Sequence, residues 1–284
     1  MNVAILLTCF NRIDKTLACL ESLFTATCPT ELQFKVFLVD DNSPDKTALI
    51  VKKKFPQVDV VNGDGNLFWA GGMRFIWTYA MKNGSFDGFL LLNDDVQLAK
   101  NVLTDLMFTH KYCKENFSRE GAYVSTTIDF SSDEWSYGGR RVINLLFKHT
   151  LKIINCSDIP KKAMVANANI LLIMKSIVDK IGIFNEKYTH GIADYDYTLS
   201  IVKAGFPLLI APNIGGYCPD DHGKNWLDSN LTFRKRVEYL YSPKGLAYKE
   251  YLFYLWRHFP LQIPYYFSLI WLKTFFPIIW EKLK

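Results

Sequence analysis

The sequence lacks the features that mark secreted, zinc-binding and nucleic-acid-binding proteins. Its six cysteines include no C-x-x-C pair, so neither a zinc site nor a disulfide framework is indicated, and a reducing cytosol fits best. The N-terminus has no basic start followed by a cleavable apolar stretch, which predicts a chain that begins in the cytosol. A net charge of +5 in 284 residues is too small to indicate a nucleic-acid partner, and we expect none.

The sequence does contain enough apolar material for a folded α/β core. Hydrophobic residues make up 49% of the chain and charged residues 21%, which excludes global disorder. Three short apolar runs each end in polar residues and lead into helical spacing, the third of these helices being expected over residues 75–81. This alternation predicts a doubly wound, mostly parallel sheet flanked by helices, and such sheets bind ligands beyond the carboxyl ends of their strands. The three runs are residues 3–7, 34–39 and 58–61.

The most informative motif is Asn93-Asp94-Asp95, which directly follows a fourth apolar run at residues 89–92. Adjacent carboxylates at the exit of a strand can hold a divalent cation against a diphosphate, and Mg²⁺ and Mn²⁺ prefer such oxygen ligands. The same residues can instead form a turn or cap a helix expected over residues 102–108. The motif therefore indicates metal-assisted group transfer, with a purely structural role as the alternative.

Further motifs follow in a characteristic order along the chain. Polar strand exits are seen at Thr8-Cys9-Phe10-Asn11-Arg12, Val39-Asp40-Asp41-Asn42-Ser43 and Gly65-Asn66-Leu67-Phe68-Trp69-Ala70-Gly71-Gly72. Past the middle of the chain come Asn167-Ala168-Asn169, Asp194-Tyr195-Asp196-Tyr197 and Lys203-Ala204-Gly205-Phe206. In this combination the motifs resemble the family 2 glycosyltransferases of the GT-A fold, over roughly residues 3 to 225.

The resemblance implies a nucleotide-sugar donor. Asp40 or Asp41 would accept hydrogen bonds from uracil N3–H or ribose hydroxyls, unless residues 40–47 only form a turn and a helix cap. Gly71 and Gly72 would let the donor approach the backbone and Arg74 would meet phosphate; the alternative is a flexible turn and a surface cation. The expected donor contacts are Thr8, Asn11, Arg12, Asp40, Asp41, Asp64, Asn66, Gly71, Gly72, Arg74 and Asp94.

The resemblance also implies a divalent cofactor, Mn²⁺ or Mg²⁺. Asp95 matches the metal-binding carboxylate of the family, and Asp94 matches the neighbour that faces ribose or metal. His222, in a later loop, would complete the metal site or is a solvated loop histidine. The other histidines are expected to be structural or surface residues: His110, His149, His190 and His258.

Asp194 matches the general base with which the family deprotonates the acceptor hydroxyl. The family motif is usually written Glu-Asp-x-Asp, and Ala193 stands here where the glutamate is common. With one like charge fewer nearby, the pKa of Asp194 is expected to be less strongly raised. Attack on the face opposite the diphosphate predicts inversion in a single displacement. The alternative is that Asp194 and Asp196 only cap the helix that follows.

Contacts to the acceptor sugar are expected from four residues. Trp135 and Tyr137 would supply an aromatic wall, or they are ordinary core or rim aromatics. Asn169 lies in the motif that precedes an apolar run, and Asp196 would touch the acceptor, orient its segment or cap the helix.

From about Tyr239 onward the chain is dense in aromatic residues. Its longest uncharged stretch there, residues 259–272, contains two prolines and is shorter than the roughly 18 to 20 residues of a membrane-spanning helix. We expect a helix that lies in the membrane interface, or else a hydrophobic cap on the catalytic domain or a homodimer interface. The basic residues expected to face anionic lipid are Arg234, Lys235, Arg236, Lys244 and Lys249.

These observations predict three parts. Residues 1–110 form the nucleotide-sugar-binding half, residues 111–230 the acceptor-binding and catalytic half of the same domain, and residues 231–284 the aromatic, basic C-terminal segment. The expected function is inverting, metal-dependent transfer of a sugar, with a UDP-sugar favoured, to a glycan or lipid-linked glycan in cell-surface polysaccharide or lipopolysaccharide synthesis. The protein would be cytoplasmic and peripheral on the inner face of the cytoplasmic membrane.

Two other functions are compatible with such a fold. A catalytically silent scaffold is disfavoured because the four expected catalytic and metal positions are intact: Asp94, Asp95, Asp194 and His222. A sugar nucleotidyltransferase would need a glycine-rich, lysine-bearing loop after the first strand, where residues 8–12 contain neither glycine nor lysine.

Overall fold

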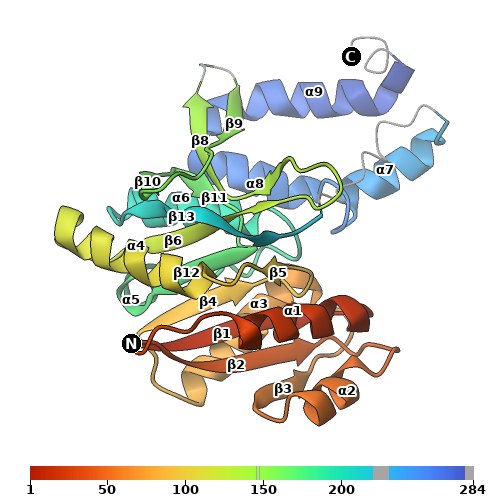
Figure 1. Cartoon of the computed structure of the whole chain (residues 1–284). Coiled ribbons are helices and arrows are strands. Elements are labelled where there is room, and N and C mark those ends of the chain that lie inside the picture. Colours follow the sequence, from red (N-terminus) through yellow and green to blue (C-terminus); the bar gives the residue numbers. More distant parts are fainter. Residues whose placement is uncertain (145, 147, 220–229, 279–284) are drawn as a thin grey trace.

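One mixed β-sheet forms the centre of the molecule (Figure 1). A computed structural model of the chain describes residues 1–144, 146, 148–219 and 230–278. The strand order is β10-β13-β6-β12-β4-β1-β2-β3, with β5 beside β13 and β7 beside β6. The strands are β1 (Asn2–Cys9), β2 (Gln33–Asp40), β3 (Val58–Asn62), β4 (Gly88–Leu92), β5 (Gln97–Leu98), β6 (Ala122–Ile128), β7 (Trp135–Tyr137), β10 (Lys161–Lys162), β12 (Ile170–Met174) and β13 (Leu208–Tyr217).

Strand directions bring four polar exits to one edge of this sheet. β1 runs parallel to β2 and β4, and β2 runs parallel to β3, so all four strands end on the same side. β12 lies antiparallel between β4 and β6, so the residues just before β12 reach the same edge. The predicted α/β fold with a mostly parallel sheet is confirmed.

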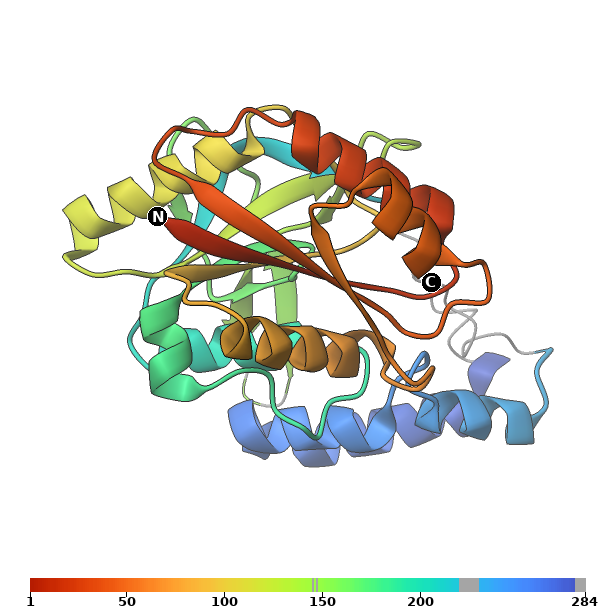
Figure 2. The ribbon, with the colours of Figure 1, turned by 90° about the horizontal axis from the view of Figure 1, so that it is seen from below.

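The sheet is buried on both faces because its central strands are apolar at nearly every position. In β1, Val3, Ile5 and Leu7 pack on the side of α1 (Ile13–Thr25), α2 (Thr47–Lys54) and α4 (Val102–Phe117). Ala4 and Leu6 face the other side, which is covered by α3 (Phe68–Lys82), α5 (Lys175–Ile181) and α6 (Ala193–Lys203). Figure 2 shows helices on both sides of the sheet. Burial on both faces explains why these strands are continuous apolar runs in the sequence.

Helix α3 begins at Phe68, well before the helix expected over residues 75–81. The cause is Asp41, whose carboxylate accepts hydrogen bonds from the backbone N–H groups of Gly65 at 2.8 Å, Leu67 at 2.9 Å and Phe68 at 3.3 Å. These bonds satisfy N–H groups that a helix start leaves without partners, and they offset the poor helix propensity of glycine. Gly71 and Gly72 therefore lie inside the helix and not in a flexible turn.

A smaller sheet joins β8 (Gly139–Asn144) to β9 (His149–Ile153) and β11 (Val165–Ala166). His149 at the start of β9 connects this sheet to the C-terminal segment. Its ring stacks on Phe259 with the ring centres 4.1 Å apart, and its Nδ1 lies 2.7 Å from Oε1 of Gln262. The hydroxyl of Tyr266 donates to the carbonyl oxygen of His149 at 2.9 Å.

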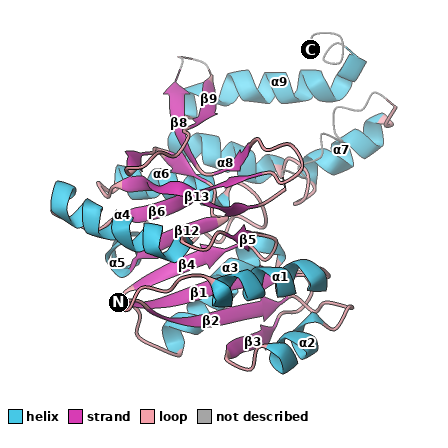
Figure 3. Ribbon diagram, viewed as in Figure 1, coloured by secondary structure: helices cyan, strands magenta, loops and turns pink. Residues whose placement is uncertain are grey.

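The C-terminal segment consists of α7 (Phe233–Tyr241), α8 (Tyr248–His258), the short 3-10 helix η2 (Pro260–Gln262) and α9 (Ile263–Phe275). α8 lies beside α6 (Figure 3). It belongs to the main core, where its Tyr254 and Leu255 are buried. α9 lies at the end of the molecule opposite α2 (Figure 1). Within the described ranges, we find no helix with the length and apolar character needed to cross a bilayer.

Candidate active site

Two adjoining cavities lie at the edge where the parallel strands end. The first, of about 320 Å³, is lined by Arg12, Trp69, Asn93, Asp95, Tyr137, Asn167, Asn169, His190, Gly191, Ile192, Asp194, Tyr195 and Cys218. The second, of about 460 Å³, is lined by Thr8, Cys9, Phe10, Asn11, Arg12, Asp41, Gly65, Phe68, Trp69, His190 and Lys244. Arg12, Trp69 and His190 line both cavities, so the two form one cleft with two ends. Cavities of this size accommodate small-molecule ligands.

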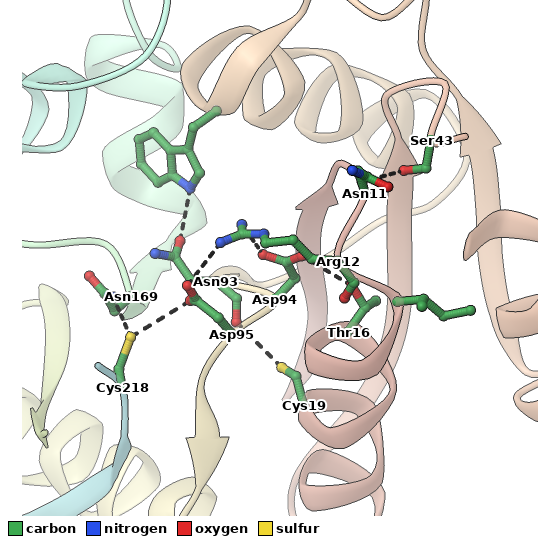
Figure 4. Close-up of polar contacts among 12 residues, drawn as sticks. Asn11, Arg12, Thr16, Cys19, Ser43, Asn93, Asp94, Asp95, Asn169 and Cys218 are labelled. Carbon is green, nitrogen blue, oxygen red and sulfur yellow. Dashed lines mark hydrogen bonds and ion pairs between the residues drawn. The ribbon is translucent and has the colours of Figure 1, made fainter. Parts of the chain in front are cut away.

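Arg12 lies between the two carboxylates at the exit of β4 (Figure 4). Its Nη2 pairs with Asp94, and its Nη1 lies 2.9 Å from Oδ2 of Asp95. The hydroxyl of Thr16 donates to the other oxygen of Asp94 at 3.0 Å. Burial raises the pKa of Asp94 to about 7; Arg12 opposes this shift and Asp95 adds to it. The site therefore carries more negative than positive charge beside the cleft.

The carboxylates fit a divalent cation of the Mg²⁺ or Mn²⁺ class. Such ions often take one or two carboxylates and complete their coordination with substrate phosphates. Asp94 is only 1% exposed, whereas Asp95 is 9% exposed and lines the first cavity, so Asp95 is the better placed ligand. Among the described residues, no group of three His, Cys, Asp or Glu side chains is arranged to hold a metal. His222 lies outside the described residues, and its role stays a prediction.

Cys218 and Asn169 form the opposite side of the acidic pair (Figure 4). The Cys218 thiol donates to Oδ1 of Asp95 at 3.6 Å, and Nδ2 of Asn169 donates to the Cys218 sulfur at 3.3 Å. Asn93 accepts a hydrogen bond from the indole N–H of Trp69 at 2.8 Å. These bonds connect β4, β12, β13 and α3 around the same cleft.

Asp194 lies in the first turn of α6 and faces the first cavity. Its Oδ2 accepts from the backbone N–H of Ala168 at 3.2 Å, and its Oδ1 accepts from that of Tyr195 at 2.8 Å. Burial outweighs these two bonds and raises the pKa of Asp194 to about 6. A carboxylate with this pKa is ionised at neutral pH and is still a usable proton acceptor.

Asp196 points away from the cleft. Its carboxylate pairs with Arg257, and its Oδ1 lies 2.8 Å from Nε2 of His258. Asp196 is 2% exposed and lines neither cavity. It therefore attaches α6 to α8, which agrees with the orienting role among the alternatives considered for it.

The expected donor residues divide between cleft lining and supporting structure. Thr8, Asn11, Arg12 and Asp41 line the second cavity. Asp40 lines neither cavity, and its two oxygens accept hydrogen bonds from the backbone N–H groups of Ser43 at 3.0 Å and Ala48 at 2.8 Å. Asp40 is thus a turn and helix-cap residue in this structure.

Six other expected donor contacts also lie outside the linings of these two cavities: Asp64, Asn66, Gly71, Gly72, Arg74 and Asp94. Arg74 donates to the backbone carbonyls of Asn185 at 3.1 Å and Tyr188 at 2.6 Å. A Cβ atom at Gly72 would clash with the hydroxyl of Thr8, so this glycine permits α3 to pack closely on β1. The side chain of Asp64 accepts from the backbone N–H of Asn66 at 2.8 Å, and both residues are exposed.

Of the expected acceptor residues, Tyr137 and Asn169 line the first cavity, and Trp135 lies outside it. Sequence reasoning did not assign Trp69, Asn167, Tyr195, Cys218 or His190 to the site. Trp69, Asn167 and Tyr195 lie within the motifs described in the sequence, so their positions in those motifs could have indicated that they line the site. His190 was expected to be structural or on the surface, yet it lines both cavities and its Nδ1 accepts from the backbone N–H of Trp69 at 3.3 Å.

Comparison with known proteins agrees with this geometry. The family model described as glycosyl transferase family 2 matches residues 4–160, more than half of the 284-residue chain. The chain belongs to this family. No curated protein sequence matches this family 2 chain.

Solved structures similar to the family 2 chain share its fold at low sequence identity. A mannosyltransferase, PcManGT from Pyrobaculum calidifontis, in complex with GDP-Man and Mn²⁺, has a TM-score of 0.53 and 12% identity, over 83% of this chain and 64% of that one. S. aureus TarS 1–349 has a TM-score of 0.55 and 16% identity, over 83% and 68%. GalNAc-T7 with UDP, GalNAc and Mn²⁺ has a TM-score of 0.58 and 12% identity, over 84% and 47%. The chain thus spans about two thirds of the first two neighbours and about half of the third.

Proposed function

We propose that the chain is an inverting, metal-dependent glycosyltransferase that moves a sugar from a nucleoside-diphosphate donor to a glycan acceptor. One observation carries the proposal: Asp95 and Asp194, which come from different halves of the chain, line the same cavity. A ligand that bridges them would have its diphosphate near the acidic pair and its anomeric carbon between the two carboxylates. Family membership and the nucleotide-sugar complexes of the structural neighbours support the same reaction class.

The reaction needs one proton acceptor and one charge-stabilising site. Asp194 takes the proton of the acceptor hydroxyl as the acceptor oxygen bonds to the anomeric carbon. The bond from that carbon to the diphosphate oxygen breaks, and the leaving nucleoside diphosphate keeps the electron pair. Attack and departure on opposite faces invert the anomeric centre without a covalent enzyme intermediate.

Asp95, with Asp94 behind it, would hold the divalent cation. When bound, the cation supplies charge neutralisation for the leaving diphosphate. Arg12 already balances part of the negative charge of the pair and lines both cavities. We infer that Arg12 keeps the two carboxylates close together and also contributes positive charge where the cavities join.

A UDP-sugar is the first donor to test, and a lipid-linked glycan for cell-surface polysaccharide or lipopolysaccharide is the proposed acceptor. Support for a membrane surface comes from large apolar side chains exposed on the C-terminal segment: Phe233, Trp256, Leu261, Tyr265, Phe267, Leu272, Phe275, Phe276 and Ile278. We infer that this segment places the enzyme on the cytosolic leaflet, with a second copy of the chain as the competing occupant.

The structure changes the set of cations available to lipid. Arg236 is 9% exposed and donates to the carbonyl oxygen of Thr274 at 2.8 Å, so it holds α7 to α9. Lys244 lines the second cavity. Arg234 pairs with Glu238 at 3.1 Å, which leaves Lys235 and Lys249 as the exposed cations without an acidic partner among the described residues.

A thermal-shift screen of the purified protein against UDP, GDP, dTDP and CMP, each with Mn²⁺ and with EDTA, tests the proposal. We expect one nucleotide to raise the unfolding temperature only in the presence of metal, because a ligand that binds the native state stabilises it. The variant Asp95→Ala should lose this shift, and Asp194→Asn should keep it while losing sugar transfer. No shift with any nucleotide at saturating concentration would favour a silent scaffold. Transfer retained by Asp194→Asn would contradict the base assignment.

A further inference from the structure

Lys244 lines the second cavity although it belongs to the C-terminal segment. The other residues of that cavity lie at the end of β1, just after β1, β2 or β3, or in α3, except for His190, which lies in the loop before α6. Lys244 lies in the turn between α7 and α8, far along the chain from those exits. The C-terminal segment therefore supplies one wall of the cleft.

The turn that carries Lys244 is closely packed. The N–H of Gly245 donates to the carbonyl oxygen of Ser242 at 2.9 Å, and that of Ala247 donates to the same oxygen at 3.2 Å. A Cβ atom at Gly245 would clash with the carbonyl of Tyr239, so the backbone can take this path only with glycine there. The position of Lys244 is thus set by the fold of the turn.

Helix α8, which follows the turn, is attached to the loop that lines both cavities. Oε2 of Glu250 accepts from the backbone N–H of Thr189 at 3.0 Å. The carbonyl oxygen of Thr189 in turn accepts from the N–H of Ala70 at 3.1 Å and that of Gly71 at 3.4 Å. Lys244, His190 and the start of α3 therefore belong to one connected structure around the second cavity.

Backbone groups at this cavity have little capacity left for an anion. The start of a helix often binds phosphate through free N–H groups. At the start of α3, however, Asp41, His190 and Thr189 accept the hydrogen bonds of the N–H groups of residues 67–71. The negative charge of a donor must then be met by side chains.

Among the described residues that line this cavity, one is an arginine and one a lysine, Arg12 and Lys244; His190 also lines it, with its Nδ1 accepting the Trp69 N–H. Arg12 is paired with both Asp94 and Asp95. Lys244 is exposed and has no ion pair within the described part of the chain. It is the cation whose charge is not already balanced by a neighbouring carboxylate there.

We propose that Lys244 contacts the diphosphate of the nucleotide donor, so that the C-terminal segment forms part of the donor site. The inference rests on the proposed function and deepens it. The nucleotide is a better match than a lipid-borne phosphate, because the second cavity is built by the exits of β1, β2 and β3. A lipid-borne phosphate would come with the acceptor, and Asp194, the proposed base for the acceptor, lines only the first cavity. An ammonium group on a diphosphate gains a charge-assisted hydrogen bond without a fixed donor geometry.

Calorimetric titration tests the proposal. Wild type, Lys244→Gln and Lys244→Arg are each titrated with the nucleoside diphosphate found by the screen and with its bare nucleoside. Lys249→Gln is the matched control, because Lys249 is also an exposed lysine of the C-terminal segment and lines neither cavity. We expect Lys244→Gln to weaken diphosphate binding about three- to tenfold and nucleoside binding hardly at all. Lys244→Arg should retain most of the affinity, and Lys249→Gln should bind like wild type.

Diphosphate affinity unchanged in Lys244→Gln would overturn the role of Lys244, and so would an equal loss for diphosphate and nucleoside. Sedimentation with phosphatidylglycerol vesicles separates the lipid source: lost vesicle binding with unchanged diphosphate affinity would assign Lys244 to a membrane phosphate and also overturn the proposal. If wild type binds none of the diphosphates, the proposed function itself fails. If wild type binds one and Lys244→Gln binds it equally well, only the role of Lys244 fails.

Discussion

Asp194, the proposed general base, is oriented and made more basic by its surroundings. Two backbone N–H groups hold its oxygens in place, while partial burial raises its pKa to about 6. The absence of a glutamate at position 193 does not leave the pKa at its ordinary value, because burial is the largest cause of the shift. The carboxylate is oriented and moderately basic without a neighbouring carboxylate.

The rate of transfer should therefore depend on pH through Asp194. We expect kcat/KM to be half-maximal near pH 6, to be constant about one pH unit above that, and to fall about tenfold per pH unit well below it, because only the ionised carboxylate accepts the proton. A pH-rate profile of wild type with saturating metal measures this. A profile that stays flat to pH 5 would argue against Asp194 as the base.

The same pKa shift predicts that Asp194 lowers stability at neutral pH. The pKa of Asp194 in the folded protein, about 6, is above its ordinary value of 3.8, so the folded state binds the proton more tightly than the unfolded state. Stability then falls as pH rises from about 4 to about 6, and the cost is complete above that range. Asp194→Asn should be more stable than wild type by about 3 kcal/mol at pH 8 and about equal to it at pH 3.5, measured by urea unfolding. Equal stability at both pH values would contradict this expectation.

At the scale of elements, α3 packs on β1 through one glycine. Gly72 lies against Thr8, whose hydroxyl would clash with any Cβ there, whereas the nearest atoms to a Cβ at Gly71 would be 3.7 Å away. Gly72→Ala should destabilise the protein by about 1 to 3 kcal/mol through overpacking. Gly71→Ala, its neighbour in the same helix, should be neutral or stabilising by up to about 1 kcal/mol, because alanine favours helix. Thermal unfolding of both variants measures these changes in stability. Similar losses of stability in the two variants would show that general helix distortion, and not the contact with Thr8, is responsible.

Helices α6 and α8 are joined by a carboxylate with two partners. Asp196 is almost fully buried and pairs with Arg257 and His258. Asp196→Ala should cost about 3 kcal/mol of unfolding free energy, because it leaves the buried His258 and the partly buried Arg257 without this acceptor. Asp179→Ala is the control: Asp179 pairs with Lys175 at 2.6 Å on an exposed surface, and its loss should cost less than about 1 kcal/mol. An equally small loss for both variants, by urea unfolding, would mean that the buried pair does not hold α6 to α8.

The positions of the strand exits could be predicted from the sequence because the polar residues there directly follow apolar runs. Asp95 after β4, and Asn11 and Arg12 after β1, line the cleft as the βα alternation requires, with Asp94 buried behind Asp95. Asp40 and Asp41 were indistinguishable in the sequence, because both carboxylates accept backbone N–H groups and only tertiary packing places Asp41 at the cleft. His190 and Lys244 were not predictable as cleft residues, because long-range contacts place them and no local pattern marks them.

At the scale of the whole molecule, the exposed apolar side chains of the described chain are not evenly distributed. Trp256 is 64% exposed, Phe267 48% and Phe275 52%, all on the helices at one end of the molecule. An apolar surface of this kind on an amphipathic segment is typical of interfacial membrane binding, and it also suits self-association.

The double variant Phe267→Ser and Phe275→Ser should bind anionic vesicles at least about tenfold more weakly than wild type, because it loses two aromatic side chains that would enter the lipid. Leu49→Ser is the control, since Leu49 is 65% exposed on α2 at the other end. Vesicle co-sedimentation measures the difference. Unchanged vesicle binding, together with a change from dimer to monomer in light scattering, would instead assign this surface to a second copy.

The joint between α6 and α8 also bears on how the protein is made. Arg257 and His258 are translated 61 and 62 residues after Asp196, so the ribosome completes the lining of the first cavity, which ends at Cys218, well before it supplies the partners of that carboxylate. Until those partners emerge, α6 has a buried acid without a counterion and cannot settle in its final place. A chain released early, even one carrying every cleft residue up to Cys218, would be unable to position its base. Catalytic competence would thus appear late in synthesis, only after α8 has been made.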